Sequence, residues 1–347
     1  MFQDITIDKA RKMMEDKPFT WIDVRSPSEY QNATIPGSLN IPLFNDDERA
    51  EVGTIYTQVD VHAAKERGLE IFSKKLPAFI RAFSEIEGEK AVFCWRGGMR
   101  SRTAATVLDL MGIHAYRLQG GYRAYRKWVV DQLENADFHP PAFILGGYTG
   151  TGKTYMLRKL QKEGYPVLDL EGMANHRGSI FGDIGLRAYN QKTFDALLVQ
   201  KLLELGNPPY VLMEAESKRV GKIVLPEFLV RNKEQGVQII IELPVEERVR
   251  NILDDYRPWE YESACLAAFG RIKERIHTPV AKKIEEDLKG GRFESAVRLL
   301  LEYYYDPRYD HSLSISEKAR VKKIRATHTD EALQQLKALL GLKNFIR

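Results

Sequence analysis

One cysteine in a stretch rich in glycine and arginine has the clearest potential for chemistry in this sequence. Cys94 follows the apolar residues 91–93, and a helical pattern begins at Thr103. Gly97 and Gly98 permit a sharp turn between the two elements, because glycine adopts backbone angles that are closed to other residues. A loop that closes on a helix start directs several N–H groups at one point, which binds anions and favours the thiolate form of a cysteine. Cys94 is therefore predicted to be a nucleophile.

The residues after Cys94 supply the rest of this predicted site. Arg100, six positions after the cysteine, is predicted to be catalytic with it, and Arg96 and Arg102 add positive charge. The predicted anion-binding loop consists of Trp95, Arg96, Gly97, Gly98, Met99 and Ser101. The alternative is a half-buried free cysteine beside a glycine turn. The strand, the glycine pair and Arg100 occur together, and this combination favours a functional site.

A second stretch predicts a phosphate-binding site. Residues 147–154 match the pattern G-x-x-x-x-G-K-T, with an apolar strand at 142–145 before them and an amphipathic helix at 155–162 after them. Backbone N–H groups would cradle a di- or triphosphate, Lys153 would neutralise its oxygens, and Thr154 could hold Mg²⁺. The predicted phosphate-binding residues are Gly147, Tyr148, Thr149, Gly150, Thr151, Gly152, Lys153 and Thr154. The strand and helix around the motif argue against the alternative, a glycine-rich turn without a ligand.

A polar, glycine-containing segment at 175–182 follows the next predicted strand, 166–170. His176, Arg177 and Ser179 in this segment are candidate substrate contacts at the mouth of the phosphate site. The sequence equally allows an ordinary surface connection here, so both interpretations stay open.

Two carboxylates, Glu214 and Glu216, follow a third predicted strand at 210–213. In nucleotide hydrolases the matching strand ends in an aspartate that supports Mg²⁺. The glutamates keep metal binding feasible, but they put ATP hydrolysis in doubt. Arg248 and Arg250 lie at the start of a predicted helix and could close over phosphates, although a solvated helix face is the commoner use of such residues.

Short apolar runs alternate with helical patterns along the chain, which predicts an α/β protein with mostly parallel sheets. The boundary between two domains is predicted at 131–141, a polar segment with two prolines. The first domain is then 1–130, and the second is 142–347 with a helical and basic C-terminal region. From Arg271 onward the chain has 17 Lys and Arg against 11 Asp and Glu, which is compatible with a polyanionic partner such as RNA.

Composition limits the class of protein. The chain has 347 residues, long enough for two domains, and its net charge is +4. No apolar run approaches the roughly 18 residues that cross a membrane, and the first residues do not resemble a signal peptide. Only two cysteines are present, Cys94 and Cys265. This count argues against a disulfide framework or a cysteine zinc site and favours a cytoplasmic location.

Residues 1–130 resemble a rhodanese-like sulfurtransferase domain. The matching segments are Asp23-Val24-Arg25 with Glu29, Ile35-Pro36-Gly37-Ser38, the Cys94 loop, and Leu118-Gln119-Gly120-Gly121. In that family the loop cysteine carries a chalcogen as a persulfide. The five residues between Cys94 and Arg100 exceed the usual four, and this longer loop resembles that of rhodanese-fold phosphatases, whose pocket holds a phosphate-sized anion.

With the 147–154 motif included, the whole chain resembles the tRNA 2-selenouridine synthase family, a rhodanese domain fused to a P-loop NTPase-like domain. The resemblance implies a tRNA-modifying selenotransferase that acts on the wobble 2-thiouridine in the anticodon region. It implies S-geranylation with geranyl diphosphate and then displacement of the S-geranyl group with selenophosphate. On this interpretation the P-loop binds the diphosphate, and Cys94 takes selenium as a selenosulfide. The resemblance implies no tightly bound cofactor, with Mg²⁺ as an option, and leaves the oligomeric state open.

Two alternatives remain from the residues themselves. One is an ATP-dependent phosphotransferase fused to a rhodanese-like sulfurtransferase or phosphatase domain, which would turn over ATP without tRNA. The other is a non-catalytic RNA-binding regulator that uses a nucleotide as a switch, whose RNA binding would not depend on Cys94.

Overall fold

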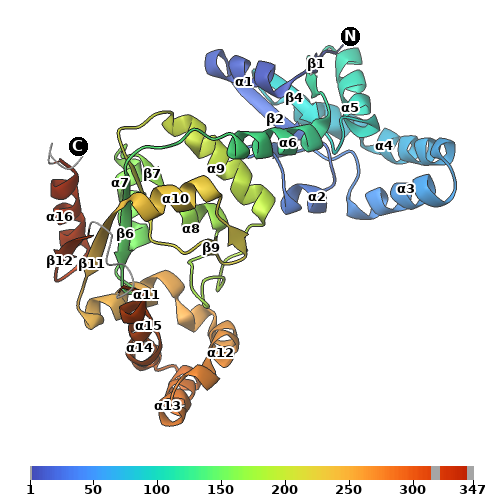
Figure 1. The fold of residues 1–347 in the computed structure, drawn as a ribbon. Coiled ribbons are helices and arrows are strands. Elements are labelled where there is room, and N and C mark those ends of the chain that lie inside the picture. The colour runs from blue at the N-terminus through green and yellow to red at the C-terminus, as the bar shows by residue number, and fades with distance from the viewer. Residues whose placement is uncertain (1, 314–320, 342–347) are drawn as a thin grey trace. The chain divides into compact units, whose positions relative to one another are not determined.

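The computed structural model describes residues 2–313 and 321–341, without the side chains of 310–313, and the chain divides into two compact units (Figure 1). One unit runs to Asn135 and includes Asp195–Val199. The other comprises Ala136–Phe194 and the chain from Gln200 onward. Two parts of the predicted basic C-terminal region, residues 314–320 and 342–347, lie outside the described part of the chain. No helix in the described part is long and apolar enough to cross a membrane.

The first unit is built on a parallel five-stranded sheet in the order β1-β5-β4-β2-β3. Its strands are β1 (Asp4–Ile5), β2 (Phe19–Asp23), β3 (Leu39–Asn40), β4 (Glu89–Phe93) and β5 (Tyr116–Leu118). Its helices are α1 (Ile7–Asp16), α2 (Pro27–Asn32), α3 (Asp46–Gln58), α4 (Val61–Ser84), α5 (Met99–Leu110) and α6 (Gly121–Glu134).

Apolar cores cover both faces of this sheet, and its central strands are therefore nearly continuous apolar runs. Successive side chains of a strand point to opposite faces. Trp21 and Phe93 accordingly pack in one core with Leu118, whereas Ile22 and Val92 pack in a second core on the other face. The predicted α/β class with a parallel sheet is confirmed for this unit.

Two element boundaries in this unit differ from the prediction. Helix α6 continues to Glu134, and the N–H of Asn135 still bonds to the carbonyl of Asp131, so the predicted connection at 131–141 began too early. Helix α3 was not predicted, because none of its residues is buried and it has no apolar stripe. A capping box between Asn45 and Glu48 marks its start, and that signal was readable in the sequence.

The second unit has a parallel sheet in the order β12-β11-β6-β8-β7. The strands are β6 (Ala142–Gly147), β7 (Val167–Leu168), β8 (Val211–Glu214), β11 (Val237–Glu242) and β12 (Val321–Arg325). A short antiparallel pair adds β9 (Arg219–Val220) and β10 (Ile223–Val224). The helices that accompany the sheet are α7 (Lys153–Lys162), α8 (Leu170–Ala174), α9 (Gln191–Leu205), α10 (Glu227–Gln235), α11 (Val245–Tyr256) and α16 (Thr329–Gly341).

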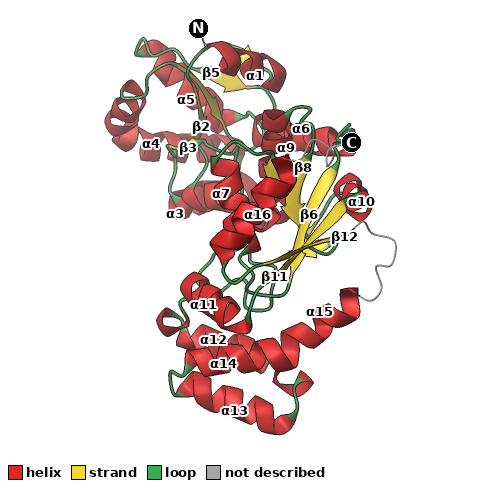
Figure 2. Ribbon diagram, turned by 90° about the vertical axis from the view of Figure 1, so that its left-hand side faces the viewer, coloured by secondary structure: helices red, strands yellow, loops and turns green. Residues whose placement is uncertain are grey.

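A group of helices separates β11 from β12 in sequence and gathers at one end of the second unit (Figure 2). Its members are α12 (Glu262–Gly270), α13 (Thr278–Lys289), α14 (Phe293–Leu300), a π-helical turn (Leu301–Tyr305) and α15 (Asp306–Leu313), with 3-10 turns at Pro258–Glu260 and Lys273–Arg275. These helices have a core of their own that includes Phe269 and Ile284. Gly270 and Gly290 lie at the ends of α12 and α13, and Pro279 lies in the first turn of α13, where its missing N–H is tolerated.

Candidate functional site

Cys94 lies directly after β4, at the carboxyl end of the first unit's sheet. The chain turns through Gly97, whose φ is +64°, and α5 begins at Met99 with Gly98 as its N-cap. The predicted loop residues Met99, Arg100 and Ser101 therefore form the first turn of the helix, which starts four residues before the predicted Thr103. The first N–H groups of a helix have no acceptor within it. The predicted placement of the cysteine beside a helix N-terminus is confirmed.

The thiol of Cys94 is buried, with only 4 % of the residue exposed, and it packs among apolar side chains. Within the described part of the chain, its one polar side-chain contact is with Ser101, whose Oγ lies 3.2 Å from Sγ and 3.3 Å from the carbonyl of Gly98. Ser101 is fully buried as well, whereas Trp95, Arg96 and Met99 are exposed.

The start of α6 holds this loop in place. The N–H of Tyr122 donates to the carbonyl of Cys94 at 2.8 Å, and the N–H of Arg123 donates to the carbonyl of Trp95 at 2.9 Å. Gly121 precedes these residues with φ +59°, and a Cβ at this position would overlap the carbonyl oxygen of Cys94. Gly121 thus lets the helix approach the backbone of the cysteine loop closely.

Replacing Gly121 by alanine is expected to displace the Cys94 loop, because backbone atoms cannot yield to the added Cβ. Gly112→Ala is the matched control, since Gly112 also has a positive φ of +72° but has open space around its Cβ position. The control should show only backbone strain of about 1 kcal/mol. Thermal unfolding and the rate of Cys94 alkylation measure the two effects. Equal behaviour of the two variants would contradict the role of Gly121.

Arg100 is held by Glu29, which belongs to α2. The guanidinium donates two hydrogen bonds to the carboxylate, one of them at 3.1 Å between Nη2 and Oε1. Burial opposes the charge of Arg100, but the bonds to Glu29 outweigh it and raise the pKa of the guanidinium. The interaction with Cys94 acts in the same direction. Arg100 is therefore a fixed positive charge near Cys94, and Glu29 is a positioning residue that the sequence prediction did not assign.

Asp23 and Arg25, which belong to the segment that resembles the rhodanese-like family, form an ion pair near this site. Both side chains are buried, and Arg25 Nη2 lies 2.6 Å from Asp23 Oδ2. The same guanidinium donates to the carbonyl of Ala33 and lies 4.5 Å from the ring centre of Tyr122. Because every charge is paired, this cluster supports the ends of β2 and α6 rather than offering a binding group.

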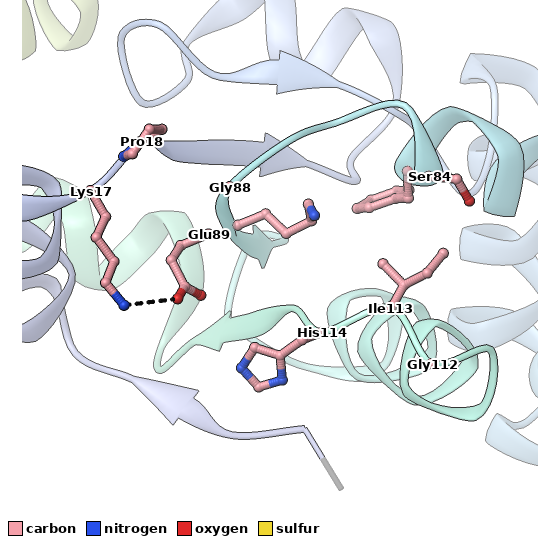
Figure 3. A pocket seen from close by; sticks show the side chains of 10 residues that line it. Lys17, Pro18, Ser84, Gly88, Glu89, Gly112, Ile113 and His114 are labelled. Carbon is pink, nitrogen blue, oxygen red and sulfur yellow. Dashed lines mark ion pairs between the residues drawn. The ribbon is translucent and has the colours of Figure 1, made fainter.

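A separate hollow of about 560 Å³ lies in the first unit (Figure 3). Lys17 and Glu89 form an ion pair at its edge, and His114 and Ile113 line another side. Strand β4 starts at Glu89 and ends just before Cys94. Since a strand rises about 3.3 Å per residue, the hollow lies roughly 15 Å from the cysteine, at the opposite end of the strand. It is not part of the Cys94 site.

The predicted phosphate loop connects β6 to α7 in the second unit. Gly147, Gly150 and Gly152 all have positive φ, and α7 begins at Lys153, two residues before the predicted start. Lys153 Nζ donates to the carbonyls of Gly147 at 2.9 Å and Tyr148 at 3.1 Å. Burial lowers the pKa of this ammonium, although nearby carboxylates oppose the shift. Lys153 thus lies over the loop, where the negative charge of a bound ligand would stabilise the charged form of its buried ammonium.

Residues far away in sequence brace the phosphate loop. Arg248 is buried and donates to the carbonyl of Thr149 at 2.9 Å while it forms a two-bonded ion pair with Asp306. Asn251 donates to the carbonyl of Gly150 at 2.8 Å, and the hydroxyl of Tyr309 accepts from the N–H of Gly147 at 2.9 Å. The interpretation of Arg248 as a solvated residue is wrong, because its guanidinium is buried between the loop and Asp306. A role of Arg248 in closing over phosphates stays a prediction. Arg250 is the exposed residue of the predicted pair and forms an ion pair with Glu247.

An acidic pair lies beside Thr154. Its hydroxyl donates to Glu171 Oε2 at 2.7 Å, and Glu171 also bonds to Glu216. Burial, followed by the negative charge of Glu216, raises the pKa of Glu171 to about 7. Glu171 was not predicted as a site residue, although it directly follows a predicted strand. Oxygen donors of this kind suit a hard divalent cation.

Glu214 does not lie after the strand, as predicted, but ends β8 itself. It is the last residue of the strand, and its buried carboxylate accepts from the N–H of Leu170 at 2.9 Å. Burial, with the charge of Asp169 next in importance, raises its pKa well above the usual value. Glu214 therefore supports the junction of β7 and α8, and Glu216 is the one of the two predicted carboxylates that meets Glu171.

The predicted substrate segment covers the acidic pair. A Cβ on Gly178 would lie 2.7 Å from Glu171 Oε1, so the segment passes directly over that carboxylate. Arg177 bonds to Asp255 and to the carbonyl of Ile184, and Ser179 bonds to the hydroxyl of Tyr256 at 3.0 Å. These contacts anchor the segment to the end of α11.

His176, the third member of the predicted trio, packs against Gly182 of the segment and against Gly221. Its Nδ1 accepts from the N–H of Gly178 at 3.1 Å. Burial lowers the pKa of His176, whereas Asp183 and Glu171 oppose the shift. The structure thus brings the predicted substrate segment to the phosphate loop, with Arg177 and Ser179 serving as anchors.

Glu171→Gln is expected to stabilise the metal-free protein at pH 8. The pKa of Glu171 is about 7 in the folded state, whereas the unfolded chain releases this proton near the ordinary glutamate pKa of 4.5. The wild type therefore loses stability as the pH rises from 4.5 to 7, by about 1–3 kcal/mol, and the variant should not. Unfolding at several pH values without Mg²⁺ measures the difference. Glu227→Gln, at an exposed position, is the control, and identical pH profiles of variant and wild type would contradict the expectation.

Known proteins match both units of the chain. Residues 6–127 match the model of the rhodanese-like domain, and residues 140–268 match the model described as the tRNA 2-selenouridine synthase AAA domain. A tRNA 2-selenouridine synthase of Sulfurovum sp. is 33% identical over 328 residues, which cover 84% of this chain and 88% of the relative. The protein of that name from Hydrogenovibrio crunogenus is 34% identical over 341 residues, with 88% and 92% covered.

Proposed function

The chain belongs to the tRNA 2-selenouridine synthase family, and we propose that it replaces the sulfur of a wobble 2-thiouridine in tRNA by selenium in two steps. The first step is S-geranylation with geranyl diphosphate. The second is displacement of the S-geranyl group with selenophosphate. The observation that carries the proposal is the presence, in one chain of this family, of a cysteine at a helix N-terminus and a separate phosphate loop.

Alkylation prepares the base for exchange. A thiocarbonyl sulfur is a poor leaving atom, whereas an S-alkyl group leaves as a thiolate after selenium adds to the same carbon. The phosphate loop suits the diphosphate of the prenyl donor, because its N–H groups and Lys153 compensate the charge of the leaving diphosphate. Thr154, Glu171 and Glu216 would hold Mg²⁺, which would supply further neutralisation of the diphosphate.

The Cys94 site suits the second co-substrate. Selenophosphate is a tetrahedral anion, and the first-turn N–H groups of α5 with the charge of Arg100 favour an anion beside Sγ. The basic C-terminal region suits the phosphate backbone of the tRNA substrate.

Mass analysis of tRNA nucleosides tests the proposed function. Incubation of 2-thiouridine tRNA with geranyl diphosphate should yield S-geranyl-2-thiouridine, and later addition of selenophosphate should yield 2-selenouridine. Selenouridine formation without geranyl diphosphate would contradict the two-step route. Turnover of ATP in the absence of tRNA would instead support the phosphotransferase alternative.

A further inference from the structure

Cys94, Arg100 and Ser101 form an arrangement suited to the transfer of a phosphoryl group. The hydroxyl of the fully buried Ser101 lies 3.2 Å from Sγ of Cys94. Arg100 is fixed by Glu29 with its charge acting on Cys94. Five residues separate the cysteine from the arginine, and the helix start lies between them. These features provide a nucleophile, an anion-binding turn and a hydroxyl that can stabilise the thiolate.

We propose that Cys94 attacks the phosphorus atom of selenophosphate, forms an S-phosphocysteine and releases hydrogen selenide ion for the tRNA. This inference rests on the proposed function and specifies which atom of its second co-substrate reacts. It also assigns the site a phosphatase-like activity that needs no tRNA.

Each step balances without a further reagent. The thiolate forms an S–P bond, and the P–Se bond breaks with both electrons going to selenium, which leaves as HSe⁻. Water then attacks phosphorus, the S–P bond breaks with both electrons returning to sulfur, and orthophosphate leaves with the regenerated thiolate. HSe⁻ adds to the carbon that bears the S-geranyl group and expels geranylthiolate.

The selenosulfide route implied by the rhodanese resemblance gives a different phosphorus product. Attack of the thiolate on selenium leaves the electrons of the P–Se bond on phosphorus, so the product is phosphite. Orthophosphate would form by that route only with an added two-electron oxidant, and the proposed reaction contains none. Attack on phosphorus therefore accounts for selenium transfer with the groups at hand.

The three residues have distinct roles in the two steps. Cys94 is the nucleophile, and the N–H groups at the start of α5 with Arg100 stabilise the charge on the transferred group. Ser101 donates to sulfur when the S–P bond breaks, because the thiolate then regains its negative charge. Selenide is a weak base, so it leaves phosphorus without a general acid. The second step should therefore depend on Ser101 more than the first.

Rapid acid quenching of the full chain after mixing with selenophosphate tests the proposal. Phosphorus NMR of the products should show orthophosphate, and mass analysis should find phosphorus on the Cys94 peptide. Ser101→Ala should slow release of phosphate by about 10–100-fold and let the S-phosphocysteine accumulate. p-Nitrophenyl phosphate serves as a second probe without selenium, and its hydrolysis should be lost in Cys94→Ser. Cys265→Ala, which removes the only other cysteine, should behave like the wild type.

Phosphite among the products, or selenium with its isotope pattern on the Cys94 peptide, would overturn the proposal. The proposal would also be overturned if neither the wild type nor Ser101→Ala contained phosphocysteine at early times. Selenouridine in tRNA is measured in parallel. Phosphocysteine without selenouridine would refute the proposed function alone, whereas selenouridine with phosphite would refute the attack on phosphorus alone.

Discussion

Cys94→Ser is expected to abolish selenium incorporation into tRNA while S-geranylation continues. A serine hydroxyl is not ionised at neutral pH and is a far weaker nucleophile than a thiolate, so the loss should be at least about a thousandfold. Serine is almost the same size as cysteine, and the buried packing around Sγ should remain. The expected readout is accumulation of S-geranyl-2-thiouridine in tRNA treated with both co-substrates.

The control for this prediction is Cys265→Ala, because Cys265 lies in α12 of the second unit and is also buried. It should retain both steps. Selenouridine formation by Cys94→Ser at more than about a tenth of the wild-type rate would exclude a nucleophilic role for the thiol. Loss of both steps in Cys94→Ser would contradict the division of labour between the two sites.

Lys153→Ala is expected to abolish geranylation and leave the selenation of tRNA that already carries the S-geranyl group. The Lys153 ammonium lies over the phosphate loop and donates to the carbonyls of Gly147 and Tyr148 and to the hydroxyl of Thr151. Removing it eliminates charge compensation for the leaving diphosphate, which should reduce the rate by about 10²–10³-fold.

Lys162→Ala is the matched control, because it removes a lysine from the exposed last turn of the same helix. Its geranylation rate should equal that of the wild type. Both reactions are followed by nucleoside mass analysis, one with 2-thiouridine tRNA and the other with S-geranyl tRNA. Equal losses of both reactions in Lys153→Ala would show that the phosphate loop does not act in geranylation alone.

Local sequence signals located both candidate sites of the protein. Cys94 after an apolar strand, and the glycine-rich motif ending in Lys153 and Thr154, could be predicted because backbone conformation there depends on neighbours in sequence. The parallel α/β organisation of both units followed from the alternation of apolar runs with helical patterns.

Contacts between distant segments determined how these centres are supported. Glu29 holds Arg100 across 71 positions, and Asp306 holds Arg248 across 58. Glu171 and Glu216 meet only because β7 and β8 are neighbours in the sheet. No local pattern specifies such pairings, since they depend on strand order and on which faces pack together.

The sequence by itself determined which residues are chemically capable and which local turns present them. Tertiary structure alone decided their surroundings: the burial of Cys94 against Ser101, the raised pKa of Glu171, and the bracing of the phosphate loop by α11 and α15. The physical reason is that desolvation and the charges of non-local neighbours, which set reactivity, exist only once the chain has folded.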